Sequence, residues 1–224
     1  MTMMKYVAAV LIGIAGLGLQ HARADTVTYY LTFGNTPYAG PYYAGPYASV
    51  AVNRTSTITA TITFTSLTAG GNIYLMGDGS SVAVNVNASL FSVSGITGSN
   101  NGTGFTPGSY SNGGSGIVDA FGTFNQTISS FGGFTHSSDT ISFTLTNNSG
   151  TWGSASAVLT ANSGGSLAAA HIFVTAAPAN VKHGAFATVF AAGDGAQVPD
   201  GGTTVMLLAM ALGALGMARR FLTS

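Results

Sequence analysis

Residues 55–67 read TSTITATITFTSL, and this stretch decides the fold class of the chain. Threonine and serine alternate here with the apolar residues Ile58, Ala60, Ile62 and Phe64. A period of two residues, carried largely by β-branched side chains, is typical of a strand that buries one face and exposes the other. We therefore predict a strand over residues 55–67 whose apolar side chains enter a hydrophobic core.

Further stretches show a similar alternation and are separated by turn residues. No long amphipathic helical pattern interrupts them. Strands at this spacing favour an all-β fold, either an antiparallel β-sandwich or a jelly roll. The length of the chain leaves room for one such domain, which we place at residues 25–197. The other predicted strands are residues 26–33, 81–87, 90–94, 121–128, 140–146 and 168–175.

Three segments between these strands have a different character. Residues 152–162 can form a short helix before Gly164, and residues 95–116, rich in Gly, Ser and Asn, are predicted to be a mobile surface loop. Residues 77–80 read GDGS, which predicts a hairpin turn. A calcium site that uses Asp78 is the alternative for this turn.

The chain carries few charges. Only 5% of its 224 residues are charged, and six Lys and Arg balance six acidic residues, all of which are Asp. Nucleic-acid binding requires clustered Lys and Arg, whereas residues 25–198 contain only Arg54 and Lys182. We therefore expect no nucleic-acid partner. Cysteine is absent, which excludes disulfides and thiolate chemistry.

The first 24 residues have the three parts of a secretory signal peptide. Lys5 precedes an uncharged stretch over residues 6–19, and the small residues Ala22 and Ala24 stand just before Asp25. We predict export through the Sec pathway and cleavage by signal peptidase after Ala24. A retained anchor is the alternative, but the apolar stretch is shorter than the roughly 20 residues that a bilayer requires.

Residues 198–224 form a second terminal segment. As a helix, its apolar run would rise about 24 Å, slightly less than a hydrocarbon core of about 30 Å. The positive-inside rule places the basic residues that follow in the cytoplasm and the domain outside. A helix packed on the domain is the alternative, which the lack of a polar face disfavours. The parts are, in order, the motif Val198-Pro199-Asp200-Gly201-Gly202, the apolar run 203–218 and the membrane stop Arg219 and Arg220.

This tail resembles the PEP-CTERM-like sorting signals of exported proteins in Gram-negative bacteria, and most closely their VPDSG-CTERM variant. Gly201 stands where the variant has Ser, and the other four motif residues match. The resemblance implies that an exosortase, a membrane-embedded cysteine transpeptidase, cuts near the motif and releases or transfers the protein. It also implies an inner-membrane intermediate that precedes the cell surface or the extracellular space. The middle of the chain is similar to PEP-CTERM-tagged surface proteins without an established activity.

A small tandem repeat, PYAGPYYAGPY, occupies residues 37–47. Proline excludes a central strand, so we predict a turn-rich loop. Its tyrosine rings could stack on sugars, or they could pack over one end of the sandwich, which is the more common fate of aromatic rings. The candidate stacking residues are Tyr38, Tyr42, Tyr43 and Tyr47.

Residues suited to catalysis or metal binding are scarce. The chain has no GxSxG elbow, no HExxH motif and no phosphate-binding loop. His171 lies in an apolar run and is predicted to be a partly buried core histidine rather than a metal ligand, whereas His136 and His183 fall in predicted loops. A triad built from His136, Asp139 and a loop serine has no sequence support. We expect no catalytic residue, no metal and no cofactor, with calcium left open.

The sequence favours a non-enzymatic exported protein of the cell envelope or extracellular matrix, processed by an exosortase and associated with exopolysaccharide or biofilm. The alternative is a carbohydrate-binding, lectin-like surface module that uses the tyrosine loop. A secreted hydrolase is a third hypothesis, against which the shortage of acidic residues and histidines argues.

Overall fold

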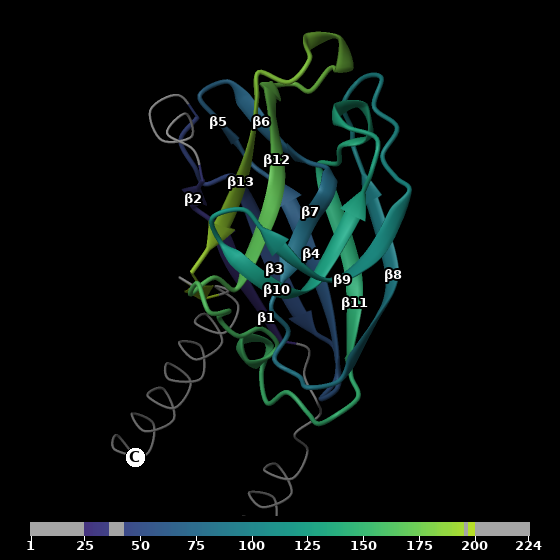
Figure 1. Ribbon diagram of the computed structural model, residues 1–224, viewed down its shortest axis with the longest axis vertical. Coiled ribbons are helices and arrows are strands. Elements are labelled where there is room, and N and C mark those ends of the chain that lie inside the picture. The colour runs from purple at the N-terminus through teal and green to yellow at the C-terminus, as the bar shows by residue number, and fades with distance from the viewer. Residues whose placement is uncertain (1–24, 36–42, 195–196, 200–224) are drawn as a thin grey trace, which may run out of the picture.

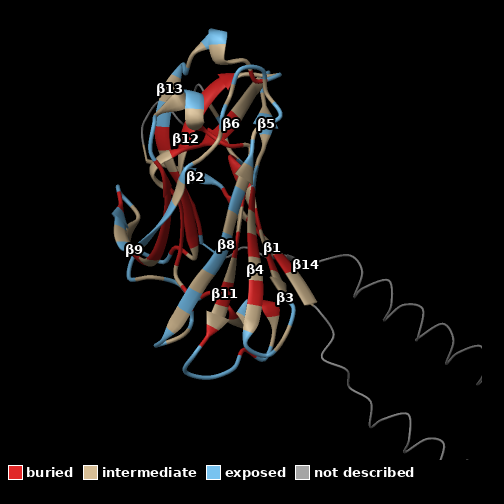
Figure 2. Cartoon of the chain, turned by 90° about the vertical axis from the view of Figure 1, so that its right-hand side faces the viewer, coloured by how far each residue is buried: buried red, intermediate tan, exposed pale blue. Residues whose placement is uncertain are grey.

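The computed structural model describes residues 25–35, 43–194 and 197–199, which form two antiparallel sheets packed face to face (Figures 1 and 2). The prediction of an all-β fold is confirmed. The first sheet has the order β14 (Gln197–Pro199), β1 (Asp25–Leu31), β3 (Ala48–Arg54), β4 (Thr59–Ser66), β11 (Thr140–Asn147) and β8 (Phe91–Ser99). The second has the order β2 (Phe33–Gly34), β13 (Ala187–Gly193), β12 (Ala168–Ala176), β7 (Asp78–Val84), β10 (Gly122–Ser130) and β9 (Tyr110–Val118), with β6 (Asn72–Met76) also on β12 and β5 (Thr68–Ala69) on β6.

The strand that decides the fold class is shorter than predicted. In β4, Ala60, Ile62 and Phe64 are fully buried, as the alternation predicts. Ile58 was expected in the core but is 41% exposed. The reason is that residues 55–58 form a turn, in which the backbone N–H groups of Thr55 and Ser56 both donate to the carbonyl of Thr59.

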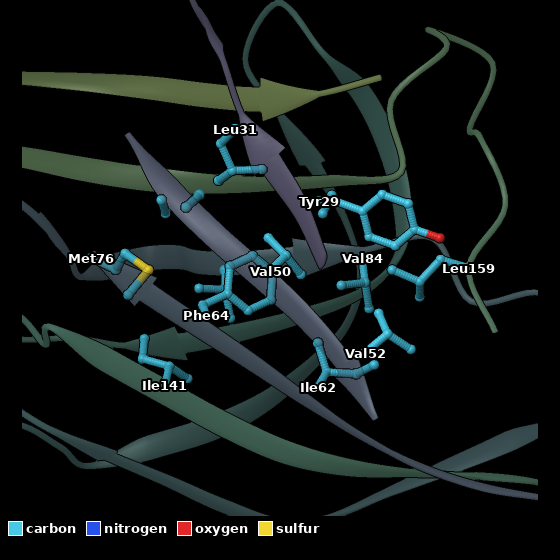
Figure 3. Packing of buried hydrophobic residues seen from close by; sticks show 14 of the residues in the cluster. Tyr29, Leu31, Val50, Val52, Ile62, Phe64, Met76, Val84, Ile141 and Leu159 are labelled. Carbon is cyan, nitrogen blue, oxygen red and sulfur yellow. The ribbon is translucent and has the colours of Figure 1, made fainter. Parts of the chain in front are cut away.

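The core lies between the two sheets. Figure 3 shows Val50, Ile62 and Phe64 of the first sheet in one cluster with Met76 and Val84 of the second. All five side chains are fully buried. Burying a side chain of this kind contributes about 1.5–3 kcal/mol, so this cluster is a major source of stability.

Two connections close one side of the sandwich by changing sheets. β1 belongs to the first sheet, but the chain then passes to β2, which pairs with β13 in the second. β13 continues in the same way into β14, which pairs with β1. The backbones come close at this crossing, because a Cβ on Gly193 would collide with the carbonyl oxygen of Tyr30. Glycine is therefore required at position 193.

The outer face of the second sheet is partly covered. Ala192, Ala169 and Ala83 lie side by side on β13, β12 and β7. Phe124 and Val118, from the two strands of the β9–β10 hairpin, pack on this alanine row. Because the outer face is covered here as well, β12 is buried on both faces, which explains why it reads as a nearly continuous apolar run.

The predicted helix over residues 152–162 is wrong. A single 3₁₀ turn, Ala155–Ala157, occupies the segment. Trp152 is buried and its indole Nε1 donates to the carbonyl of Asn87 at 2.8 Å. Leu159 forms a β-bridge with Val86. These long-range contacts hold the segment against the end of the sandwich and override its local helical tendency.

The predicted surface loop over residues 95–116 is also wrong at both ends, because β8 continues to Ser99 and β9 begins at Tyr110. The glycines that suggested a loop allow close packing between these two edge strands. A Cβ on Gly98 would collide with the ring of Tyr110, whose hydroxyl bonds to the Oγ of Ser138 at 2.6 Å.

Residues 77–80 do not form the predicted hairpin turn. β6 and β7 run in the same direction, and both pair antiparallel with β12. The segment is therefore a bulge within one long strand, and it lies opposite His171, whose carbonyl accepts from the N–H of Gly77 at 3.1 Å. Asp78 and Ser80 have positive φ angles of 62° and 52°, which accommodate the extra residues.

No helix within residues 25–35, 43–194 and 197–199 is long and apolar enough to cross a membrane. The predicted signal peptide and the predicted sorting helix lie outside the described residues.

Candidate functional site

The start of the C-terminal motif forms an edge strand of the first sheet. In β14, Val198 lies opposite Thr28 of β1, and Pro199 lies opposite Val27. Proline has no backbone N–H to donate, so an edge strand is where a sheet tolerates it. The remaining predicted site residues of the tail, Asp200, Gly201, Gly202, Arg219 and Arg220, lie outside the described residues.

The other predicted processing site borders the start of β1. Ala22 and Ala24 lie outside the described residues, and β1 begins at Asp25, the next residue. One carboxylate oxygen of Asp25 accepts from Nε of Arg54 at 2.7 Å, and the other accepts from the backbone N–H of Ala155 at 2.6 Å. The first residue after the predicted cleavage point is thus fixed to two other parts of the domain.

The start of β1 and the end of β14 lie at the same end of the sandwich, because the two strands pair antiparallel and lie side by side (Figure 2). We call this the exit end. It also carries three loops, residues 55–58, 87–90 and 148–153, which are joined by backbone hydrogen bonds. Trp152 donates to the carbonyl of Thr57 at 2.7 Å, and Asn148 donates to the carbonyl of Leu90 at 2.9 Å.

The tyrosine loop is described only in part. Tyr38 and Tyr42 lie outside the described residues. Tyr47 is 2% exposed and packs edge-on against Tyr74 with ring centroids 5.0 Å apart, so its faces are not open to a ligand. Tyr43 is partly buried against the core. For Tyr47 the structure therefore shows packing, the alternative that the sequence left open.

His136 and Asp139 are each held by other groups. Nδ1 of His136 lies 2.7 Å from the carbonyl of Thr106. The carboxylate of Asp139 accepts from the N–H of Asn101 at 2.8 Å and from Oγ of Ser99 at 3.3 Å. The two side chains therefore serve to fix loops at the end opposite the exit end. His183 ends a 3₁₀ turn and is exposed.

His171 is partly buried, but it lies on the outer face of the second sheet rather than in the core between the sheets. Its ring stacks between Phe190 and Phe173, with centroids 4.4 Å and 5.2 Å away. Burial lowers the pKa of His171, while the carboxylate of Asp78 and the backbone of Gly79 partly oppose this shift. Nδ1 of His171 is buried without a hydrogen-bond partner among the described residues.

The stack around His171 continues as a row of aromatic rings that the sequence did not predict. Phe173 packs edge-on against Phe134, and Phe134 packs edge-on against Phe105. The rings come from four separate segments of the chain, so no local pattern could reveal the row. Within the described residues, no group of three or more His, Asp, Glu or Cys side chains is placed to hold a metal ion.

Residues 197–221 match the family model of the VPDSG-CTERM motif, a PEP-CTERM-like exosortase sorting signal. The match confirms the resemblance on which the interpretation of the tail rests. A signal of this kind implies exosortase processing of an exported protein that passes a membrane and reaches the cell surface. No curated protein and no solved structure matches the chain.

Proposed function

We propose that this chain is a non-enzymatic surface protein that an exosortase cuts near residues 198–202, and that the released domain associates with uncharged exopolysaccharide outside the cell. The observation that carries the proposal is the sorting signal over residues 197–221. Its first three residues already form a strand of the folded domain. A cut after this strand would leave the domain intact, because β14 would keep its pairing with β1.

The start of the domain supports cleavage by signal peptidase after Ala24. Asp25 bonds to Arg54 and to the backbone of Ala155, and it is the first residue of β1. Removal of residues 1–24 would therefore leave all of these contacts in place.

The proposed polysaccharide surface is the outer face of the first sheet, which we call the hydroxyl face. Its side chains form ranks in register: Thr63 on β4 lies opposite Ser142 on β11, and Thr61 lies opposite Thr144. The Oγ1 of Thr63 and the Oγ of Ser142 are 3.0 Å apart. The face consists of Thr26 and Thr28, Ser49, Thr59, Thr61, Thr63 and Thr65, Thr140, Ser142, Thr144 and Thr146, and Ser92, Ser94, Thr97 and Ser99.

The geometry of the hydroxyl face suits an uncharged polymer. Neighbouring strands place hydroxyl groups about 4.8 Å apart, and alternate residues along a strand place them about 7 Å apart. Every hydroxyl group can donate and accept a hydrogen bond, as can the hydroxyl groups of a sugar. The positions named contain no charge that would select an ionic ligand.

The proposal of a non-enzymatic protein is supported by the contacts of the side chains that were candidates for catalysis. His136 and Asp139 are occupied by loop contacts, and His171 is enclosed by aromatic rings. A lectin-like role remains the second candidate. The proline and tyrosine repeat of residues 37–47 favours it, and its stacking residues would be Tyr38 and Tyr42, since Tyr47 is buried.

Intact-mass measurement on the protein from its native host tests the processing. We expect a chain that begins at Asp25 and ends near Pro199 to Gly202, and a heavier chain that retains residues 203–224 when the exosortase is absent. A mature protein that keeps this tail in the presence of the enzyme would rule out the processing.

Binding to immobilised neutral polysaccharide tests the hydroxyl face. The double variant Thr63→Val and Thr144→Val removes two hydroxyl groups with little change in shape, and it should weaken retention several-fold. The matched control is Thr188→Val, at an exposed position of β13 in the second sheet. Loss of binding after Tyr38→Ala and Tyr42→Ala, with the valine variant unchanged, would favour the lectin-like alternative instead.

A further inference from the structure

We propose that the exit end docks on the bilayer surface through Ile58 and Leu90 while the sorting tail still anchors the chain. The inference rests on the proposed function, since it requires the apolar run 203–218 to lie in the membrane. It adds an interaction surface and an orientation of the domain before the exosortase acts.

The first step is the length of the tether. Only residues 200–202 separate Pro199 from the apolar run. An extended chain covers at most about 3.6 Å per residue, so Thr203 lies within about 14 Å of Pro199. The headgroup layer occupies about 5–7 Å of this distance, since it accounts for the difference between the full bilayer and its hydrocarbon core. The domain is therefore held against the headgroups.

The second step is the direction in which the domain faces. Pro199 lies opposite Val27, and Asp25 and Arg54 pair two residues further toward the exit end. Figure 2 shows the loops of the exit end continuing beyond β3, β4 and β11 at this end. A chain that leaves β14 in this direction and enters the bilayer within about 14 Å brings the exit end next to the membrane.

The third step is the chemistry of the exit end. Leu90 is 61% exposed and Ile58 is 41% exposed. Ile58 and Leu90 are neighbours across the end of β11, because the carbonyl of Ile58 accepts from the N–H of Asn147 and the carbonyl of Leu90 accepts from the N–H of Asn148. Loops 55–58, 87–90 and 148–153 contain no charged residue. Two apolar side chains on uncharged loops suit the boundary between headgroups and acyl chains.

Exposure alone does not identify this surface, because Phe186 is 52% exposed at the opposite end, where its N–H donates to the carbonyl of Val174 near the end of β12. The short tether, residues 200–202, distinguishes the two ends of the domain. It brings Ile58 and Leu90 to the bilayer and keeps Phe186 away from it. Phe186 is therefore the matched control position.

The absence of cysteine permits a direct test on the full chain. Leu90→Cys, Ile58→Cys and Phe186→Cys are each labelled with an environment-sensitive fluorophore. Each labelled chain, with its sorting tail, is reconstituted into phosphatidylcholine vesicles that contain nitroxide-labelled headgroups. Flotation reports whether the tail is inserted, and quenching reports whether the label touches the lipid surface.

We expect all three chains to float and the labels at positions 90 and 58 to be quenched at least threefold more than the label at position 186. Adding Leu90→Asp to the chain labelled at position 58 should reduce its quenching by half or more. Floating chains with equal quenching at all positions would overturn the docking and leave the processed tail standing. Chains that do not float would overturn both proposals. Quenching at positions 58 and 90 that appears only with co-reconstituted inactive exosortase would assign the surface to that protein and overturn lipid docking.

Discussion

The carboxylate of Asp25 lies 2.7 Å from Nε of Arg54, and this pair ties the first residue of β1 to the last residue of β3. Arg54 is 11% exposed and Asp25 is 36% exposed at their side chains. The other carboxylate oxygen caps the N–H of Ala155, so a single side chain joins the start of the domain to two later segments. The fold thus uses the residue that follows the predicted signal peptide as a structural element.

Replacing Asp25 by Ala should lower the free energy of unfolding by about 1–2 kcal/mol. The change removes an ion pair and leaves the N–H of Ala155 without its acceptor. The partial exposure of Asp25 keeps the loss below that of a fully buried pair. Urea denaturation of the domain, residues 25–199, measures it. Asp119→Ala is the control, since exposed Asp119 accepts, among the described residues, only from the side chain of Asn35, and it should cost less than about 0.5 kcal/mol. Equal losses would contradict this account.

Ile62→Ala should destabilise the domain by about 2–5 kcal/mol, whereas Ile58→Ala should cost less than about 0.5 kcal/mol. Both residues belong to the same alternating stretch, but Ile62 is fully buried and Ile58 lies in the preceding turn. The pair therefore tests where the buried part of β4 begins. Urea midpoints at equal slope are the appropriate measurement, and similar shifts for both variants would place Ile58 in the core.

The strands with clear alternation could be predicted because the order of polar and apolar residues within each strand shows which side chains are buried. In β11, every second residue from Ile141 to Leu145 is buried, and the pattern is visible in the sequence. β9 could not be found in this way, since its glycines serve close packing against neighbouring strands and carry no hydrophobic period. The bulge over residues 77–80 also resembles a turn locally. Its role depends on β12, which lies far away in the sequence.

The candidate site also has parts that the sequence predicts and parts that it does not. The motif that begins at Val198 is contiguous, so the sequence alone identifies the sorting tail. The pairing of Val198 with Thr28 joins the two ends of the domain, and no local pattern encodes it. The hydroxyl face could be predicted only in part. Single strands show alternating threonines, but only the register between strands brings Thr63 beside Ser142.

Gly193→Ala should destabilise the domain by about 1–3 kcal/mol, because the added Cβ would collide with the carbonyl oxygen of Tyr30 where the strands change sheets. Gly153→Ala is the matched control, since a Cβ at this position meets nothing within 4 Å. Thermal unfolding of both variants is sufficient to compare them. A Gly193→Ala variant as stable as the control would show that the crossing is looser than described.

Acidification should destabilise the domain through His171. Burial between Phe190 and Phe173 lowers the pKa of His171 below its ordinary value of 6.5, so the unfolded chain binds a proton more readily than the folded one. Stability from this group is complete above pH 6.5 and is lost as the pH falls below 6.5 toward the lowered folded pKa. Urea midpoints measured from pH 7.5 down to pH 5 should therefore decrease.

The variant His171→Phe keeps an aromatic ring in the stack and has no proton to bind, so its urea midpoint should change less over this range than that of the unmodified domain. His183→Gln is the control, because His183 is exposed and its removal should leave the pH dependence in place. Asp78 is the acidic group that faces His171. A pH dependence that persists in His171→Phe and disappears in His183→Gln would assign the effect to His183 and contradict this account of His171.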